Sequence, residues 1–317
     1  SGQPRPFYRE AQIVGRESPV RGMYIMGENP IISDPDVSHA EDWFRGLEFL
    51  AVHDLFLTET ARYADVVLPG ASFAEKTGTF VNTERRVQLS EKAIEPPGTA
   101  RADLDILMEL SRRLGLETPY RHSGDVMDEI ARVTPTLRGV SHARLLEHRN
   151  GLQYPIHDAQ HLGTDFLFDD RFPTPDGRAT LVPVEYLPPA ELPDAEYPYF
   201  LNTGRQMYHW HTGTMTRRST ALDARESGPI VELHPADAVE LGVQDGDEVL
   251  VTSRRAQIRI SVRVSPRVAR HQVFVPMHYR EAAANLLTNP ALDPYAHIPE
   301  FKVCAVRVEA AAVAAGV

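Results

Sequence analysis

The sequence predicts an α/β plus β protein: a partial parallel α/β domain, a helical and irregular middle, and a carboxyl-terminal β-barrel. Short apolar strands alternate with helical stretches in the first third, as in βαβ units, whose crossovers make the strands parallel. Residues 151–198 are rich in Pro, Asp and Gly, which favour turns over regular structure. Many short strands and one helix fill the last third, and this pattern favours closure into a barrel.

The composition is that of an acidic protein without membrane segments. The 317 residues carry 33 Lys and Arg against 44 Asp and Glu, a formal net charge of −11. Because neutralising nucleic-acid phosphates needs a basic face, we expect no nucleic-acid partner. No apolar run approaches the roughly 20 residues that a membrane helix needs, and the first five residues lack the apolar core of a secretory signal. We therefore expect a cytoplasmic protein.

Cys304 is the single cysteine of the chain. One thiol cannot form an intrachain disulfide, a four-thiolate iron–sulfur site or a four-cysteine zinc site. It falls within an apolar strand predicted over residues 303–308, where no neighbour would lower the pKa of the thiol. We expect it to be a small buried hydrophobic side chain.

In the first third, strands are predicted over residues 22–26, 48–52 and 64–69, with a helix over 37–47 and a short helix over 58–63. Ligands of open parallel sheets bind beyond the carboxyl ends of the strands. These ends carry small polar groups that suit an amide-rich base and hydroxyls, namely Glu28, Asn29, Asp54, Thr58 and Gly70. Ordinary turn chemistry is the alternative explanation.

The middle of the chain is predicted to be helical and then irregular. A helix is expected over residues 102–114, and Ser123 is expected to cap a second helix that runs to about Val133. Pro188, Pro189 and Pro193 indicate a linker into a new domain.

The predicted barrel strands cover residues 199–203, 230–233, 248–253, 258–264, 273–275 and 303–308. A short helix over residues 235–241 is stopped by Gly242. Residues 258–264 alternate between apolar and polar side chains, so one face of that strand should be buried. The tail from residue 310 onward is expected to be a frayed end.

The loop after the first barrel strand, residues 203–214, is unusually polar. If it were extended, His209 and His211 would share a face, but a zinc site would need a third ligand that the local sequence does not supply. Plain packing is a second interpretation. An anionic ligand is the third, because Arg205 offers a planar fork for phosphate and the glycines let backbone N–H groups approach it.

Five stretches of sequence, taken together and in order, form a recognisable pattern. They are Met26-Gly27-Glu28-Asn29-Pro30 with Ser33-Asp34-Pro35, and residues 53–69, 75–86, 202–213, and 285–288 with 299–308. In this order they resemble the molybdopterin oxidoreductase (DMSO reductase) superfamily, most closely the catalytic subunit of molybdenum or tungsten formate dehydrogenases. The resemblance covers only the carboxyl-terminal half of such a subunit.

The resemblance implies a domain organisation. Residues 1–97 would form a partial α/β (Rossmann-like) nucleotide-binding domain, and residues 98–190 a helical and irregular connecting region. Residues 191–317 would form the molybdopterin dinucleotide-binding domain, a double-psi β-barrel like that of aspartate decarboxylase.

The resemblance also implies a set of cofactor-binding residues. In the first part these are Gly27, Glu28, Asn29, Asp54, Thr58, Lys92 and Asp103. In the barrel they are Thr203, Gly204, Arg205, Gln206, His209, His211, Thr212, His278, Asn285, Phe301 and Lys302. No catalytic or metal-ligating residue is assigned to this chain.

The cofactor implied by the resemblance is bis-molybdopterin guanine dinucleotide with Mo or W. A [4Fe–4S] centre is expected only in the missing amino-terminal half, because the cysteine cluster and the metal-ligating Cys or selenocysteine have no counterpart here. Two-electron oxidation of formate to CO2 is expected only of the complete enzyme, with that half and electron-transfer subunits as partners. The alternatives are a non-catalytic assembly module of a respiratory complex, another molybdopterin oxidoreductase such as a nitrate reductase, or a simple nucleotide-binding protein.

Overall fold

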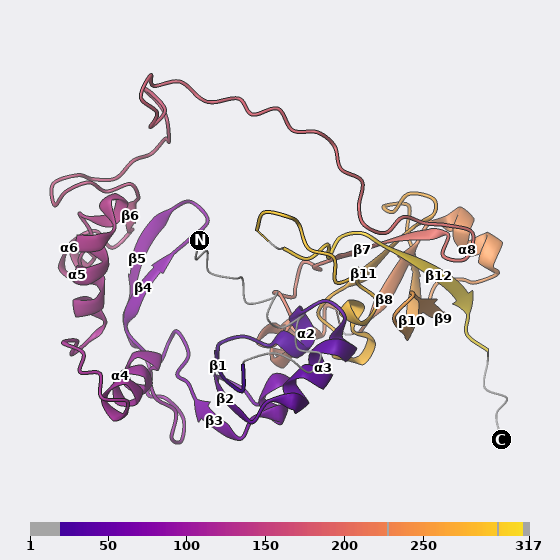
Figure 1. Ribbon diagram of the computed structural model, residues 1–317, viewed down its shortest axis with the longest axis horizontal. Coiled ribbons are helices and arrows are strands. Elements are labelled where there is room, and N and C mark those ends of the chain that lie inside the picture. The colour runs from indigo at the N-terminus through magenta and orange to yellow at the C-terminus, as the bar shows by residue number, and fades with distance from the viewer. Residues whose placement is uncertain (1–19, 227, 297, 313–317) are drawn as a thin grey trace. The chain divides into compact units, whose positions relative to one another are not determined.

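The computed structural model describes residues 20–226, 228–296 and 298–312 (Figure 1). The chain divides into two compact units, of which unit 1 comprises Ser1–Val67 and Tyr186–Val317 and unit 2 comprises Leu68–Glu185. Unit 1 therefore joins the α/β segment to the barrel, although more than a hundred residues separate them in sequence. The three domain ranges 1–97, 98–190 and 191–317 stay a prediction.

The α/β segment of unit 1 contains a three-stranded sheet in the order β1-β2-β3. Its elements are β1 (Gly22–Met26), α2 (Pro30–Ser33), α3 (Val37–Gly46), β2 (Phe49–Asp54), the 3-10 helix η1 (Thr60–Tyr63) and β3 (Val66–Pro69). β1 pairs with β2 in parallel, which confirms the predicted crossover through a helix.

One face of this sheet is packed and the other is partly open. Ile25 and Val52 are paired neighbours, and they pack with Trp43 of α3 in the core of the segment. On the opposite face, Tyr24 and Phe49 keep exposed fractions of 39% and 49%. Parallel sheets are normally covered on both faces, so exposed side chains of this size are unusual on this sheet.

Unit 2 contains an antiparallel sheet that the sequence did not predict. Its strands are β4 (Gly78–Val81), β5 (Arg86–Ser90) and β6 (Leu152–Gln153), in the order β4-β5-β6. Its helices are α4 (Asp103–Arg113), α5 (Ser123–Val133), η2 (Pro135–Leu137) and α6 (His142–Glu147). Val87, Met127, Leu145 and Ile156 form its buried core.

The prediction that Ser123 caps α5 is wrong. The His122 side chain is the cap, because its Nδ1 accepts hydrogen bonds from the backbone N–H groups of Gly124 and Asp125 at 3.1 and 3.3 Å. The Asp125 carboxylate accepts in return from the His122 N–H, which completes a capping box. The Ser123 hydroxyl instead donates to the Thr77 carbonyl.

The carboxyl-terminal part of unit 1 is a closed six-stranded barrel in the order β10-β8-β11-β7-β12-β9, as the strand pattern predicted. Its elements are β7 (Tyr199–Gly204), η3 (Thr216–Arg218), α7 (Thr220–Asp223), β8 (Ile230–Leu233), α8 (Pro235–Leu241), β9 (Glu248–Thr252), β10 (Gln257–Val264), β11 (Gln272–Pro276), η4 (Arg280–Ala282), η5 (Ala284–Leu286) and β12 (Cys304–Ala310). Ile258, Ile260 and Val262 alternate into the core, as expected. β12 includes residue 310, so the tail begins later than predicted, and residues 313–317 lie outside the described residues.

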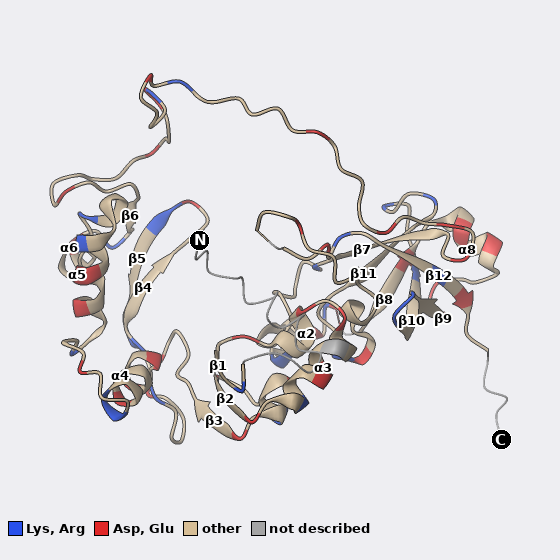
Figure 2. Ribbon diagram, in the orientation of Figure 1, with Lys and Arg blue, Asp and Glu red and all other residues tan. Residues whose placement is uncertain are grey.

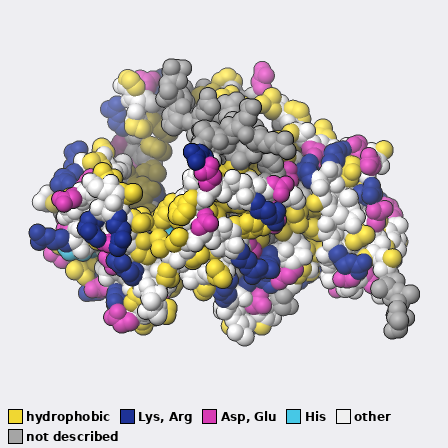
Figure 3. Space-filling model, turned by 60° about the horizontal axis from the view of Figure 1, so that its bottom comes forward, with side chains coloured by type: hydrophobic (Ala, Val, Ile, Leu, Met, Phe, Trp, Pro, Cys, Tyr) yellow, Lys and Arg dark blue, Asp and Glu magenta, His cyan; other side chains and the backbone are white. Residues whose placement is uncertain are grey.

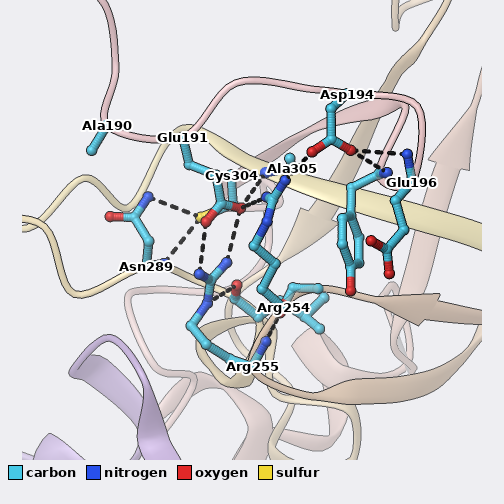
Figure 4. A network of polar contacts seen from close by, with 12 residues as sticks. Ala190, Glu191, Asp194, Glu196, Arg254, Arg255, Asn289, Cys304 and Ala305 are labelled. Atoms are coloured by element: carbon cyan, nitrogen blue, oxygen red, sulfur yellow. Dashed lines mark hydrogen bonds and ion pairs between the residues drawn. The ribbon is translucent and has the colours of Figure 1, made fainter.

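A largely buried ion pair helps to fasten the segment before β7 to the last strand of the barrel (Figure 4). Glu191 accepts two hydrogen bonds from the Arg255 guanidinium at 2.7 and 3.0 Å and one from the Ala305 N–H at 2.7 Å. Burial alone would raise the pKa of Glu191, but these bonds outweigh it and lower the pKa. The neighbouring Cys304 is buried as predicted, and burial raises the pKa of its thiol.

Charged side chains of both signs are distributed over each unit (Figure 2). On the face shown in Figure 3, Lys and Arg are interspersed with Asp and Glu. Among the described residues, no helix is both long and apolar enough to cross a membrane.

Replacing Glu191 should show how much the barrel depends on this ion pair. We expect Glu191→Gln to lower the free energy of unfolding by about 3 kcal/mol, because it leaves the Arg255 charge buried without its partner. Urea unfolding followed by circular dichroism measures this loss. The matched control is Glu196→Gln, whose carboxylate is 68% exposed and should change stability very little. Equal effects of the two variants would contradict the assignment.

Candidate functional site

The candidate site lies where the α/β segment and the barrel meet inside unit 1. The Asn285 amide, between the barrel strands β11 and β12, donates to the backbone carbonyls of Ile32 and Ser33 at 2.9 and 3.2 Å. Arg280 forms an ion pair with Glu59 at 3.0 Å across the same junction. Leu286 adds an apolar contact, because it packs against the cores of both parts. Of the predicted site residues, Asn285 is thereby joined directly to the α/β segment across the border between the two parts.

On the α/β side, Asn29 organises the loop after β1. Its side-chain oxygen accepts from the backbone N–H and the hydroxyl of Thr60 at 3.2 and 2.8 Å, and its amide donates to Glu59 at 2.8 Å. Burial alone would raise the pKa of Glu59, but the bonds from Asn29 and Arg280 outweigh it and lower the pKa. Thr58 is fully buried and accepts a hydrogen bond from the Ala61 N–H at 3.2 Å. Asn29 and Thr58 therefore fix the backbone of the loops after β1 and β2 at this border.

Gly27, Glu28 and Asp54 lie closer to solvent on the same side. Gly27 has a φ of 65°, and Glu28 is exposed. Burial raises the pKa of Asp54, against the opposing effect of hydrogen bonds from the Leu55 and Phe56 N–H groups. The Leu55 N–H lies 2.6 Å from one carboxylate oxygen of Asp54.

On the barrel side, the end of β7 and the segment before β12 are joined. The Thr203 hydroxyl donates to the Phe301 carbonyl at 2.6 Å, and the Lys302 ammonium donates to the Thr203 carbonyl at 2.7 Å. A Cβ at Gly204 would lie 2.6 Å from the Phe274 ring, so the backbone approaches this ring too closely for any side chain.

Two cations at this border have no carboxylate partner among the residues that the structure describes. The Arg205 guanidinium stacks over the Trp210 ring at 4.3 Å. Within residues 20–226, 228–296 and 298–312, no carboxylate lies within 4.0 Å of Arg205 or Lys302. Burial and the nearby Arg205 lower the pKa of Lys302. Uncompensated neighbouring positive charges of this kind suit an anionic group such as a phosphate.

The polar loop after β7 is folded into turns, so His209 and His211 do not share a face as they would if it were extended. His211 has a φ of 49° and is exposed. His209 is buried, and its Nε2 donates to the Glu226 carbonyl at 2.7 Å. The Thr212 hydroxyl is hydrogen-bonded to Thr214 at 2.9 Å.

A polar network lies beneath this loop. The Tyr279 hydroxyl contacts the Gln206 side-chain oxygen at 2.8 Å and the Glu226 carbonyl at 2.7 Å. The Gln206 amide donates to the Glu226 carboxylate at 2.6 Å. Burial raises the pKa of Tyr279 to about 12, so its hydroxyl stays protonated. The side chains of Gln206 and His209 thus anchor the loop to Glu226.

Lys92 and Asp103 belong to unit 2, whereas the residues described above belong to unit 1. Lys92 forms an ion pair with Glu95 at 2.6 Å, and Asp103 pairs with Lys76. Their part in cofactor binding stays a prediction.

Several residues of the border were not predicted from the sequence. Glu59 and Arg280 are 221 positions apart, and Arg218 lies over the Phe56 ring at 4.5 Å. Tyr279 and Glu226 were also missed. No local sequence pattern indicates these contacts. The pairs Glu59–Arg280 and Phe56–Arg218 depend on how the barrel meets the α/β segment, and Tyr279 and Glu226 are 53 positions apart.

The Asn285 junction can be tested by an isosteric change. We expect Asn285→Asp to lower the free energy of unfolding by about 2 kcal/mol, because the carboxylate cannot donate to the buried carbonyls of Ile32 and Ser33. The control Asn202→Asp changes an exposed position of β7 and should leave stability nearly unchanged. Equal urea midpoints for Asn285→Asp and the unmodified chain would contradict the role of the amide.

Comparisons with known proteins identify the family. The family model described as molydopterin dinucleotide binding domain matches residues 199–305, and that of molybdopterin oxidoreductase matches residues 4–113. The chain is 49% identical to F420-dependent formate dehydrogenase subunit alpha of Methanocaldococcus jannaschii, over 92% of this chain and 43% of that protein. It is 37% identical to the assimilatory nitrate reductase catalytic subunit of Bacillus subtilis, over 91% of this chain and 42% of that protein.

A solved structure shows the same fold. Acetylene hydratase from Pelobacter acetylenicus matches with a TM-score of 0.75 at 18% identity, over 96% of this chain and 46% of that chain. This chain therefore spans less than half the length of the curated relatives it matches. The family models and the relatives together show that the chain belongs to the molybdopterin oxidoreductase superfamily.

Proposed function

We propose that this chain is the cofactor-binding portion of a formate dehydrogenase-like molybdopterin oxidoreductase. The cofactor would be bis-molybdopterin guanine dinucleotide with Mo or W. The observation that carries the proposal is the pair of cations Arg205 and Lys302. Neither has a carboxylate partner in the part of the chain that the structure describes, and they lie on segments that meet at Thr203. A dinucleotide brings a pyrophosphate, which would supply the negative charge that pairs with these two cations.

Each group at the border has a distinct part in this proposal. Arg205 and Lys302 would hold the pyrophosphate, and Gly204 lets the backbone come close. The partly buried carboxylate of Asp54 would accept N–H bonds from guanine, and its raised pKa makes this contact sensitive to acid. When bound, the cofactor supplies the metal and the pterins that carry electrons. The protein's own contribution is binding and orientation.

The reaction proposed for the complete enzyme is the two-electron oxidation of formate to CO2. The relative at 49% identity is a formate dehydrogenase subunit, whereas the nitrate reductase of Bacillus subtilis is 37% identical. Because of this difference in sequence identity, we propose formate as the substrate of the complete enzyme, with nitrate as the second candidate. We also propose that the barrel is of the double-psi type, which two parallel strand pairs, β8 with β10 and β7 with β11, support. A Rossmann-like α/β domain and a cytoplasmic location belong to the same proposal.

Cofactor content tests the proposal directly. We expect protein purified from its host with its natural partners to carry bis-molybdopterin guanine dinucleotide. Arg205→Gln and Lys302→Gln should each weaken retention about tenfold, the value of one charged hydrogen bond. Fluorescence of the oxidised pterin and chromatography of released GMP measure the content per chain.

The matched control is Arg267→Gln, which removes an exposed arginine of the barrel that has no carboxylate within 4.0 Å among the described residues. It should retain the full content. Protein without pterin would contradict the redox proposal and favour a non-catalytic assembly module. Equal losses in all three variants would show that the border cations have no specific role.

We further propose that the chain's partner is polypeptide equivalent to the rest of the relatives' subunit, and that this polypeptide would hold a [4Fe–4S] centre. The exposed face of the β1–β2 sheet supports this, because Phe49 is 49% exposed on a parallel sheet. Electron-transfer subunits would complete the assembly.

Co-expression with that polypeptide tests the partner surface. We expect Phe49→Glu to reduce co-purification, since a charge would be buried at the interface. The control Val239→Glu alters a side chain of α8 that is 80% exposed, and recovery should be unchanged. Equal recovery with both variants would contradict the proposed surface.

A further inference from the structure

The segment after β11 crosses the base of the polar loop that follows β7. The Met277 N–H donates to the Gly204 carbonyl at 3.0 Å, which continues the pairing of β11 with β7 by one step. His278 comes next, and its side chain is 1% exposed. A buried imidazole thus lies directly under the loop that carries Arg205.

The His278 ring connects the two ends of this loop. Its Nε2 accepts a hydrogen bond from the Gln206 N–H at 2.8 Å. Its Nδ1 lies 2.6 Å from the His211 carbonyl oxygen, which can only accept, so Nδ1 carries the proton. Both contacts are satisfied by one neutral tautomer, with the proton on Nδ1 and the lone pair on Nε2.

The backbone between these contacts needs such support. His211 has a φ of 49°, a conformation that non-glycine residues adopt rarely. At Gly213, where φ is 73°, a Cβ would lie 2.8 Å from Arg217 and 3.1 Å from the His278 carbonyl. The loop therefore closes against the His278 backbone as well as against its ring.

The surroundings keep the ring neutral. Burial, the neighbouring His209 and the cations Arg205 and Arg217 lower the pKa of His278 to about 4, against the bond to the His211 carbonyl. The Tyr279 ring, whose hydroxyl stays protonated, packs against it with centroids 5.9 Å apart. If Nε2 carried a proton, its N–H would face the Gln206 N–H, and two hydrogen-bond donors would oppose each other. The contribution of His278 to stability is therefore present above pH 6.5 and is lost as the pH falls toward 4.

We propose that His278 is a positioning residue, which fixes the loop of residues 205–211 at both ends and thereby sets where Arg205 is presented to the cofactor. The geometry assigns it a role through the loop rather than a contact with the cofactor. Arg205 stacks on Trp210 within the same loop, so its position depends on the loop's shape. The significance for the cofactor rests on the proposed function, whereas the two hydrogen bonds do not.

Substitutions that mimic one nitrogen at a time separate the two contacts. An Asn side chain places its amide near the position of Nδ1 and can donate to His211, whereas a Gln side chain reaches the position of Nε2 and can accept from Gln206. We expect amide exchange at Gln206 to become about tenfold faster in His278→Ala and His278→Asn, and to stay slow in His278→Gln. Hydrogen–deuterium exchange with fragmentation to single residues, on the full chain with its natural partners, reads this amide.

Cofactor content provides the second measurement. We expect the pterin content per chain to fall in His278→Ala and to be partly rescued in His278→Gln, while exchange in β9 and β10 stays unchanged in both. Unchanged exchange at Gln206 in His278→Ala would overturn the proposal, and so would full cofactor retention by a variant whose Gln206 amide is unprotected. Absence of pterin from the unmodified protein would contradict the proposed function instead. Amide exchange at Gln206 would then still show whether His278 holds the loop through its two hydrogen bonds.

Discussion

The hydrogen bonds from the Asn285 amide to the carbonyls of Ile32 and Ser33 are the constraint on which the site depends. They join a segment near the start of the chain to one near its end. They help to fix the loops after β1 and β2 relative to the loop after β7. The Arg280–Glu59 pair and the packing of Leu286 act at the same junction, so polar and apolar contacts reinforce each other.

The site divides its polar groups into two kinds. Asn29, Thr58, Thr203 and His209 are buried, and their polar atoms are hydrogen-bonded within the chain. They shape the border and have little capacity left for a ligand. Arg205 and Lys302 differ, because no carboxylate among the described residues neutralises them. Without an anion, the positive charges of Arg205 and Lys302 repel each other, and a bound anion would reduce this repulsion.

The sequence was sufficient for the elements whose side chains alternate or repeat over several residues. β10 was predicted because Ile258, Ile260 and Val262 alternate through its length, and α8 because Pro235 and Gly242 mark its ends. The sheet of unit 2 was not predicted, since β6 has only two residues and pairs with β5 across more than 60 positions of sequence. The cap of α5 was missed because an imidazole, rather than the adjacent serine, accepts the bonds.

The sequence indicated candidate site residues but not how they are arranged in space. Motif order indicated which residues to consider, but it could not indicate that His209 would be buried beneath the loop or that His278 would bridge Gln206 and His211. Those relations arise from contacts between residues more than 60 positions apart, which no local spacing encodes.

The distance between the α/β segment and the barrel is the most direct test of this account. Spin labels at Ser38→Cys on α3 and Gln257→Cys on β10, both exposed, would be measured by double electron–electron resonance, with the buried Cys304 left unlabelled. The account predicts a single narrow distance distribution, which broadens when Asn285 is replaced by Asp. A broad distribution in the unmodified background would show that the two parts move independently, and would contradict a site built at their junction.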